Sequence, residues 1–283
     1  MAWDVRGKTA LITGATSGIG LEASVELARR GARVLMLGRD RARTDAAVAA
    51  VIARSGAKDV QSLLCDFSSQ AEIRKLAEVV LARREPLHVL VNNAGGVHKT
   101  RQLTVDGIET TFATNHLGYF LLTNLLRDLL VKSAPARVVT VASIGHRRGT
   151  LDFDDLGFAR GYRVMKAYAR SKLANVLFAA ELSRRLPSGV TSNSLHPGSV
   201  ATNIWSGAPL WAKPIIAVLY RPFFVSAEEG ARIMVALAAD PALEGVTGRY
   251  YEGGKPVDPA PLARDEALAK RLWEVSARMV GLA

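Results

Sequence analysis

Tyr168 and Lys172 lie four positions apart in the run "YARSK", within a stretch otherwise rich in Ala, Leu and Val. On a helix, side chains at this spacing lie one turn apart on the same face. A phenol beside an ammonium can exchange a proton with a reacting oxygen, which is general acid–base chemistry. The pair is also compatible with a half-buried tyrosine beside a solvated lysine, since short motifs often match by chance. Other motifs along the chain must decide between these interpretations.

A glycine-rich turn, "TGATSGIG" (13 to 20), follows an apolar run and precedes a helical pattern. Its G-x-x-x-G-x-G spacing differs from the G-x-G-x-x-G dinucleotide fingerprint, but the physics is similar. Glycines let the backbone approach a pyrophosphate, and free N–H groups at the start of a helix attract it. The position of the turn between strand and helix favours a dinucleotide site over a plain turn. Its candidate contacts are Gly14, Thr16, Ser17, Gly18, Ile19 and Gly20.

The residue that follows "LMLG" indicates which dinucleotide is bound. An acidic side chain at the end of this second strand would accept hydrogen bonds from a ribose 2′-hydroxyl. Arg39 stands there instead, and a guanidinium can hold a 2′-phosphate through paired hydrogen bonds. We therefore expect NADP as the cofactor. Asp40 follows at once and keeps NAD as the alternative.

Polar or small residues also follow the third and fourth apolar runs. Asp66 in "CDFS" could accept the adenine amino group, with Phe67 alongside, or it could simply cap the next helix. The small residues of "NNAGG" (92 to 96) permit close approach of backbone to a cofactor, or form a tight turn. The candidate contacts from this second turn are Asn93, Ala94 and Gly95.

Apolar runs alternate with longer helical patterns along the whole chain. This alternation predicts an α/β protein with a Rossmann-type, doubly wound, mostly parallel seven-stranded sheet and helices on both faces. No repeat or low-complexity linker divides it, so we expect one domain over residues 1–283. Strands are predicted at 8–13, 32–38, 60–65, 87–91, 137–142, 190–196 and 248–251. Helices are predicted at 18–30, 41–54, 69–84, 105–132, 164–186 and 226–239.

The composition favours a soluble protein with a sizeable core, since 49% of the 283 residues are hydrophobic and 22% are charged. The single cysteine and the absence of a visible signal sequence favour a cytoplasmic protein. No stretch reads as a membrane span. The net charge of +11 could suggest nucleic acid, but the arginines are scattered and aromatic residues are only 6%. We expect no nucleic-acid partner and no metal.

Six motifs in register make the chain resemble the short-chain dehydrogenase/reductase family, and within it the retinol-dehydrogenase-like branch. They are "TGATSGIG", "NNAG", Asn115 in "TNHLG", Ser143 in "VAS", "YARSK" and "HPGSVAT", and they run from about residue 7 to 255. The segment of 25 residues from Ser143 to Tyr168 is similar in length to that branch. The glycine turn departs from it, reading "ATS" where the branch usually has an asparagine.

The resemblance implies a catalytic quartet of Asn115, Ser143, Tyr168 and Lys172. Tyr168 would be the acid/base, Ser143 would position the substrate oxygen, and Asn115 would hold a water behind Lys172. Lys172 would also hold the nicotinamide ribose. An ammonium about 4 Å from the phenol would favour the phenolate by about 4 kcal/mol at an effective dielectric of about 20. The resemblance adds nicotinamide contacts from Pro197, Gly198, Val200 and Thr202.

We expect hydride transfer between NADP(H) and a hydrophobic carbonyl or alcohol. The segments 144–163 and 199–225 would shape its pocket, and the apolar 209–225 could instead form a subunit or membrane-contacting surface. The alternatives are a reductase of an activated carbon–carbon double bond and a non-catalytic NADP-binding sensor. The resemblance also implies a homodimer through helices 105–132 and 164–186, unless the long segment before Tyr168 interferes. The histidines are expected to be structural: His98, His116 and His146.

Overall fold

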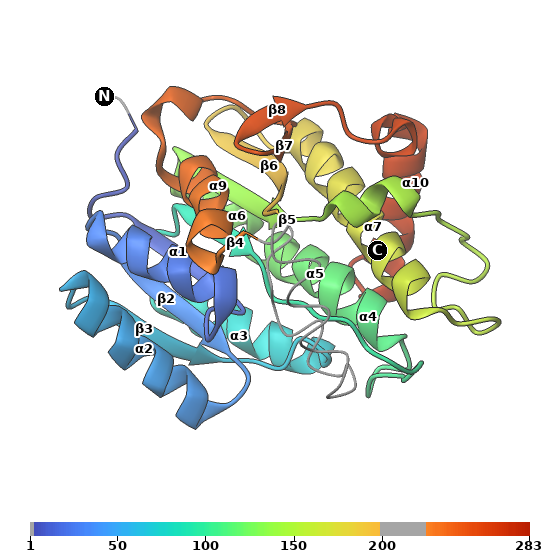
Figure 1. Ribbon diagram of the computed structural model, residues 1–283, viewed down its shortest axis with the longest axis horizontal. Helices are drawn as coiled ribbons and strands as arrows, with labels where there is room; N and C mark the ends of the chain where they lie inside the picture. Colours follow the sequence, from blue (N-terminus) through green and yellow to red (C-terminus); the bar gives the residue numbers. More distant parts are fainter. Residues whose placement is uncertain (1–2, 199–224) are drawn as a thin grey trace.

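A single twisted sheet organises the chain in a computed structural model that describes residues 3–198 and 225–283 (Figure 1). Within those residues the strand order is β3-β2-β1-β4-β5-β6-β7-β8, and each neighbouring pair but the last is parallel. The predicted doubly wound, mostly parallel sheet is therefore confirmed. The strands are β1 (Thr9–Thr13), β2 (Arg33–Gly38), β3 (Val60–Leu64), β4 (Val89–Asn92), β5 (Ala136–Val141), β6 (Val190–His196), β7 (Tyr250–Glu252) and β8 (Lys255–Val257).

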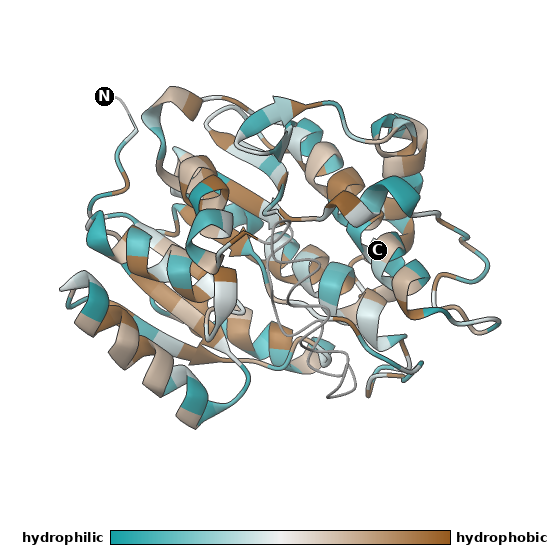
Figure 2. Ribbon diagram, in the orientation of Figure 1, coloured by the Kyte–Doolittle hydropathy of each residue, from teal (hydrophilic) through white to brown (hydrophobic). Residues whose placement is uncertain are grey.

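Helices cover both faces of this sheet, so β1, β2, β4, β5 and β6 are buried almost throughout, while the edge strand β3 is only partly buried. Figure 2 shows β2 and β5 as largely hydrophobic, the β7–β8 hairpin as more hydrophilic, and the helices as mixed along their length. Two separate apolar clusters result, one on each face. One face carries α1 (Gly18–Arg29), α2 (Arg41–Ser55) and α9 (Ala227–Ala239). The other face carries α3 (Gln70–Ala82), α5 (Gly118–Leu125) and α7 (Val164–Arg185).

An eighth strand corrects the expected count of seven. β8 folds back antiparallel onto β7, and the two are joined by Gly253 and Gly254. Both glycines have positive φ, 59° and 79°, which a two-residue hairpin turn requires. The sequence signal was the "GG" pair between short apolar runs.

The helix predicted over 105–132 begins later and is interrupted. Residues 104–107 form a turn closed by Gly107 at φ +74°, and Glu109 then accepts hydrogen bonds from the first helical N–H groups. A π-helical turn, η1 (Ala113–Leu117), follows, and the backbone breaks again at Leu126. Mid-helix π-turns are rare and often occur at functional sites. The helical pieces are α4 (Thr110–Phe112), α5 and α6 (Arg127–Lys132).

A C-terminal helix that the sequence analysis did not assign, α10 (Glu266–Met279), lies beside α7 (Figure 1). Its Trp273 stacks on Phe178 of α7 at 5.9 Å between ring centroids and meets Phe120 of α5 edge-on. The segment 150–158 packs on the same side, and Arg271 of α10 lies 4.2 Å from the centroid of the Phe153 ring. Two segments of the same chain therefore cover the outer side of α7.

Within residues 3–198 and 225–283, no helix combines the length and apolar character needed to cross a bilayer. The same residues bring together no set of three His, Cys, Asp or Glu side chains able to hold a metal ion. Cys65 is buried, and burial raises the pKa of its thiol to about 12, so it behaves as a packed side chain.

Candidate active site

Ser143 and Tyr168 meet at the carboxyl end of β5. Ser143 follows that strand as the cap of a short 3₁₀ turn, η2 (Ile144–Arg148), while Tyr168 lies in the second turn of α7. The Ser143 side chain lies beside the Tyr168 phenol and acts to lower its pKa. A Cβ on Gly145 would lie in ordinary van der Waals contact with both side chains, 3.5 Å from the Ser143 Oγ and from the Tyr168 Cε1, so Gly145 lies beside both of them. The structure thus brings together a hydroxyl and a phenol at a strand end.

Lys172 lies one turn further along α7 and is buried. Its ammonium donates to the carbonyl oxygen of Val141 at 3.0 Å and lies 5.7 Å from the centroid of the Tyr168 ring. Burial lowers the pKa of Lys172 to about 8. Asn175 donates to the same carbonyl at 3.2 Å, so the lysine is held by the end of β5.

The expected lowering of the tyrosine pKa is absent from this arrangement. Burial raises the pKa of Tyr168 above its ordinary value, and only the Ser143 side chain opposes this. The reason is geometric: the Lys172 ammonium is directed at the Val141 carbonyl instead of the phenol oxygen. The chain alone therefore holds Tyr168 as a protonated acid.

Asn115 lies in the π-turn η1, fully buried. Its amide donates to the Gly96 carbonyl at 3.0 Å and to the Ser171 hydroxyl at 3.1 Å, and its oxygen accepts from the Gly96 N–H at 2.9 Å. Ser171 in turn donates to the Tyr168 carbonyl at 2.8 Å. Asn115 thereby joins the loop after β4 to α7. Its predicted role as a water holder stays a prediction.

The glycine turn after β1 is locked against the loop after β4. The Thr13 hydroxyl accepts from the N–H groups of Asn93 and Ala94, both at 2.8 Å, and the Asn93 amide donates to the Gly14 carbonyl at 3.1 Å. A Cβ on Gly14 would lie 2.7 Å from the Ala94 Cα, so the two loops touch backbone to backbone. Asn93, predicted as a cofactor contact, thus holds the turn in shape. Thr13 was missed, although it stands first in the quoted motif.

This contact lies at the point where the strand order reverses, between β1 and β4. Ligands of open α/β sheets bind in the crevice at such a switch point. α1 begins there with Ser17, which makes no side-chain capping bond, and with no acidic residue in its first turn. The exposed Ser17 and the half-buried Thr16 and Gly18 lie beside the first backbone N–H groups of the helix, which have no partner within the helix itself, while Ile19 and Gly20 are buried.

Arg39 and Asp40 have separate tasks at the end of β2. Asp40 accepts a hydrogen bond from the Arg43 N–H at 2.9 Å as the cap of α2, so its carboxylate serves the helix. The Arg39 side chain is 74% exposed, and the Asp66 carboxylate lies 4.0 Å from it. Asp66 also accepts from the Ser68 N–H and hydroxyl, while Ser69 is the actual cap of α3. Arg39 thus presents a guanidinium at the rim of the crevice.

The remaining predicted cofactor contacts have different outcomes. The Phe67 side chain is buried, meeting Tyr119 edge-on at 6.4 Å between ring centroids, so it belongs to the core. Gly198 has φ +89° after Pro197, as a turn following β6 requires. Val200, Thr202 and most of the segment 199–225 lie outside the described residues.

The histidines do not act as a group. His146 accepts from the Ala260 N–H at 3.1 Å through Nε2, so Nδ1 carries the proton that it shares with the Ser143 carbonyl at 2.7 Å. His116 is enclosed by phenylalanines, its Nε2 lies 3.0 Å from the Ser276 hydroxyl, and burial lowers its pKa to about 3. The His98 carbonyl accepts from the Tyr162 phenol at 3.0 Å. His146 fixes the backbone of Ser143.

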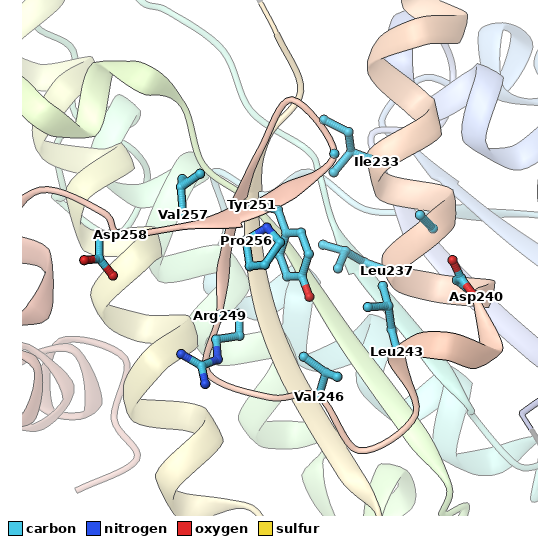
Figure 3. Close-up of a pocket in the computed structure, with 12 residues that line it drawn as sticks. Ile233, Leu237, Asp240, Leu243, Val246, Arg249, Tyr251, Pro256, Val257 and Asp258 are labelled. Carbon is cyan, nitrogen blue, oxygen red and sulfur yellow. The ribbon is translucent and has the colours of Figure 1, made fainter.

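A cavity of about 730 Å³ lies elsewhere, between α9 and the β7–β8 hairpin (Figure 3). Ile233, Leu237 and Tyr251 line it together with Arg249 and Asp240, and none of the predicted quartet reaches it. The candidate site lies instead at the carboxyl ends of the strands, where the acid, the hydroxyl and the glycine turn converge.

A parallel sheet with a glycine turn at its switch point defines an α/β protein of the dinucleotide-binding, Rossmann type. The chain belongs to the short-chain dehydrogenase family, since the family profile described as short chain dehydrogenase matches residues 8–212. It is thus a member of a family of oxidoreductases that bind a nicotinamide cofactor.

Individual relatives agree with this assignment over nearly the whole chain. The chain is 43% identical to retinol dehydrogenase 14 of Mus musculus over 291 residues, covering 98% of this chain and 87% of the relative. A crystal structure of an uncharacterized protein from Mycobacterium paratuberculosis superimposes with a TM-score of 0.80 at 33% identity, covering 99% and 96% of the two chains. The Pseudomonas aeruginosa RhlG/NADP active-site complex gives 0.71 at 25% identity, with 94% and 98% covered.

Proposed function

We propose that the protein is an NADP(H)-dependent oxidoreductase that interconverts a hydrophobic carbonyl compound and its alcohol, with Tyr168 as the acid/base. The observation that carries the proposal is the Ser143 hydroxyl beside a half-buried, protonated Tyr168 phenol at the end of β5. A hydroxyl and a phenol placed together suit a substrate oxygen on which negative charge develops.

In carbonyl reduction, a bound nicotinamide would supply the hydride. Tyr168 then donates its proton to the developing alkoxide, and its raised pKa keeps that proton in place at neutral pH. The Ser143 hydroxyl donates a hydrogen bond to the same oxygen and fixes its position. Lys172, with a pKa of about 8, is the titratable group one turn away that can return a proton to the phenolate.

The rim of the crevice supports NADP over NAD. The Arg39 guanidinium is exposed there, while the Asp40 carboxylate is occupied as a helix cap. A relative of 25% identity is named as an NADP active-site complex, which agrees with this choice. A 2′-phosphate would gain paired charge-assisted hydrogen bonds from Arg39, and a 2′-hydroxyl would gain little.

Exposed apolar side chains beside the quartet support a hydrophobic substrate. Ile144, directly after Ser143, is 38% exposed, and Met165, one turn before Tyr168, is 62% exposed. The relatives named retinol dehydrogenases point to alcohols and carbonyls of the same character. We infer that the substrate is an apolar alcohol or carbonyl compound, and that it is larger than a short, polar alcohol or carbonyl compound.

The test is a panel of aldehydes, ketones and alcohols assayed with NADPH, NADH and their oxidised forms. We expect turnover of apolar carbonyls with a kcat/KM at least tenfold higher for NADPH than for NADH. Arg39→Ala should remove most of that preference by raising the KM for NADPH, while Arg41→Ala, on the exposed start of α2, is the control. A preference for NADH in the unmodified protein, or a product reduced at a carbon–carbon double bond, would contradict the proposal.

A further inference from the structure

Arg170 lies between Tyr168 and Lys172 in "YARSK", and neither the motif nor the proposed chemistry uses it. It is 4% exposed, which is unusual for an arginine, and among residues 3–198 and 225–283 no carboxylate forms a salt bridge with it. Its guanidinium donates to three backbone carbonyls: Nε to Thr150 at 2.9 Å, and Nη1 to Leu156 at 3.0 Å and to Asp155. One side chain thus binds both ends of the stretch 150–156.

The same guanidinium lies 3.6 Å from the centroid of the Phe158 ring. Phe158 has φ +47°, a left-handed conformation that residues other than glycine rarely adopt. Burial lowers the pKa of Arg170, and Asp152, Asp155 and Glu109 oppose this at longer range. Arg170 is therefore a buried cation whose donors and flat face are matched to one irregular segment.

The segment held by Arg170 has no helix or strand of its own. In strands and helices, backbone carbonyls accept hydrogen bonds from backbone N–H groups of the same sheet or helix. In this segment the guanidinium of Arg170 supplies the donors for three of them. A lysine could not replace it, since one ammonium cannot reach three separated carbonyls and also stack on a ring.

Both ends of this segment border the candidate active site. It starts seven residues after Ser143, and α7, which carries Tyr168 in its second turn, begins six residues after the segment ends. Near its end, Tyr162 donates to the His98 carbonyl at 3.0 Å, and Arg101 donates to the Gly157 carbonyl at 3.0 Å. The segment thereby supports the loop that follows the Asn93–Gly95 turn.

We propose that Arg170 is a positioning residue for the substrate side of the site: it pins segment 150–158 to the outer side of α7 and so fixes the loops that flank Ser143 and Tyr168. The proposal rests on the oxidoreductase function proposed above and adds a residue to its specificity. The glycine turn that would bind the cofactor lies across the sheet on α1 and makes no contact with this segment among the described hydrogen bonds.

The test compares Arg170→Met and Arg170→Lys with Arg160→Met, which removes an exposed arginine from the same part of the chain. Hydrogen exchange of peptides spanning 150–162 is measured together with KM and kcat for an apolar carbonyl and with the Kd of NADPH. We expect Arg170→Met to speed exchange in that segment at least tenfold and to raise the substrate KM at least tenfold. The change in kcat should stay below fivefold and the change in NADPH Kd below twofold. Arg170→Lys should give an exchange rate and a KM between those of Arg170→Met and the unmodified protein. Arg160→Met should match the unmodified protein in both.

Phe158→Leu keeps all three carbonyl bonds and serves as the milder variant if Arg170→Met does not fold. It should raise the KM by a smaller factor in the same direction. Unchanged exchange in 150–162, or equal losses of substrate and NADPH affinity, would overturn the proposal. An unmodified protein that reduces no carbonyl would instead overturn the proposed function, and the exchange measurement would still decide whether Arg170 holds the segment.

Discussion

The pKa values of the two ionisable side chains in the "YARSK" motif, Tyr168 and Lys172, shift in opposite directions for the same reason. Burial disfavours the charged form of each group, so it raises the pKa of Tyr168 and lowers that of Lys172 to about 8. The phenol therefore keeps its proton near neutral pH, while the amine is close to giving one up. Both directions agree with the roles proposed above, Tyr168 as the proton donor in reduction and Lys172 as the group that restores its proton.

The pH dependence of carbonyl reduction follows from the Lys172 pKa. Below about pH 8 the ammonium is present and can restore the Tyr168 proton; above it the amine is neutral and this supply is lost. We expect kcat to be level between pH 6 and 7 and to fall with a midpoint near 8. Lys172→Met should remove this alkaline limb, the fall of kcat near pH 8, and should lower kcat by about 10² or more.

Lys166→Met is the matched control for that profile, because Lys166 is an exposed lysine on the same helix. It should leave both the limb and the kcat unchanged. A limb near pH 8 that persists in Lys172→Met would show that another group sets it.

At the scale of elements, the glycine turn after β1 and the loop after β4 approach each other closely. A Cβ on Gly20 would collide with the Gly14 carbonyl and lie 2.6 Å from the Asn93 amide. Gly20→Ala should therefore push the turn away from the loop after β4, lower the unfolding free energy by about 1–3 kcal/mol and weaken NADPH binding at least tenfold. Titration calorimetry and denaturant unfolding measure the two effects.

Gly56→Ala is the control for Gly20→Ala. Gly56 ends α2 at φ +73° with nothing within 4 Å of an added Cβ, so the cost is conformational strain of about 1 kcal/mol. It should leave the NADPH Kd unchanged. Similar NADPH affinities in the two variants would contradict the assigned role of the turn.

Sequence patterns predicted the elements well where one period extends over many residues. The strands from β1 to β6 and the helix carrying Tyr168 begin and end within about two residues of their predicted limits. The pattern over 105–132 failed because apolar periodicity cannot reveal a π-turn or the Glu109 cap. Arg170 was missed for a related reason: its partners are backbone carbonyls, which carry no sequence signal.

At the scale of the whole molecule, the outer side of α7 is covered by its own chain. α10 lies there through Trp273, and the segment 150–158 lies there through Arg170. The family resemblance implied a homodimer through this region. Because segments of the same chain cover the outer side of α7, we now expect no second protomer to pack there. The C-terminal helix could have been predicted, since "EALAKRLWEVSARM" is amphipathic, but its packing partner could not.

Unfolding experiments at several protein concentrations test this cover. Because the contact lies within one chain, the midpoint should not depend on concentration. Trp273→Ala should lower the unfolding free energy by about 2 kcal/mol at every concentration, and Glu274→Ala, exposed on the same helix, should not. A midpoint that rises with concentration and loses that rise in Trp273→Ala would indicate a subunit interface instead.

Tyr168→Phe tests most directly whether Tyr168 is the proton donor. The substitution removes one hydroxyl and keeps the ring that packs in α7. With an apolar carbonyl and NADPH, kcat should fall by about 10³ or more while the NADPH Kd changes less than threefold. A variant that retains more than a tenth of the original kcat would contradict the central claim.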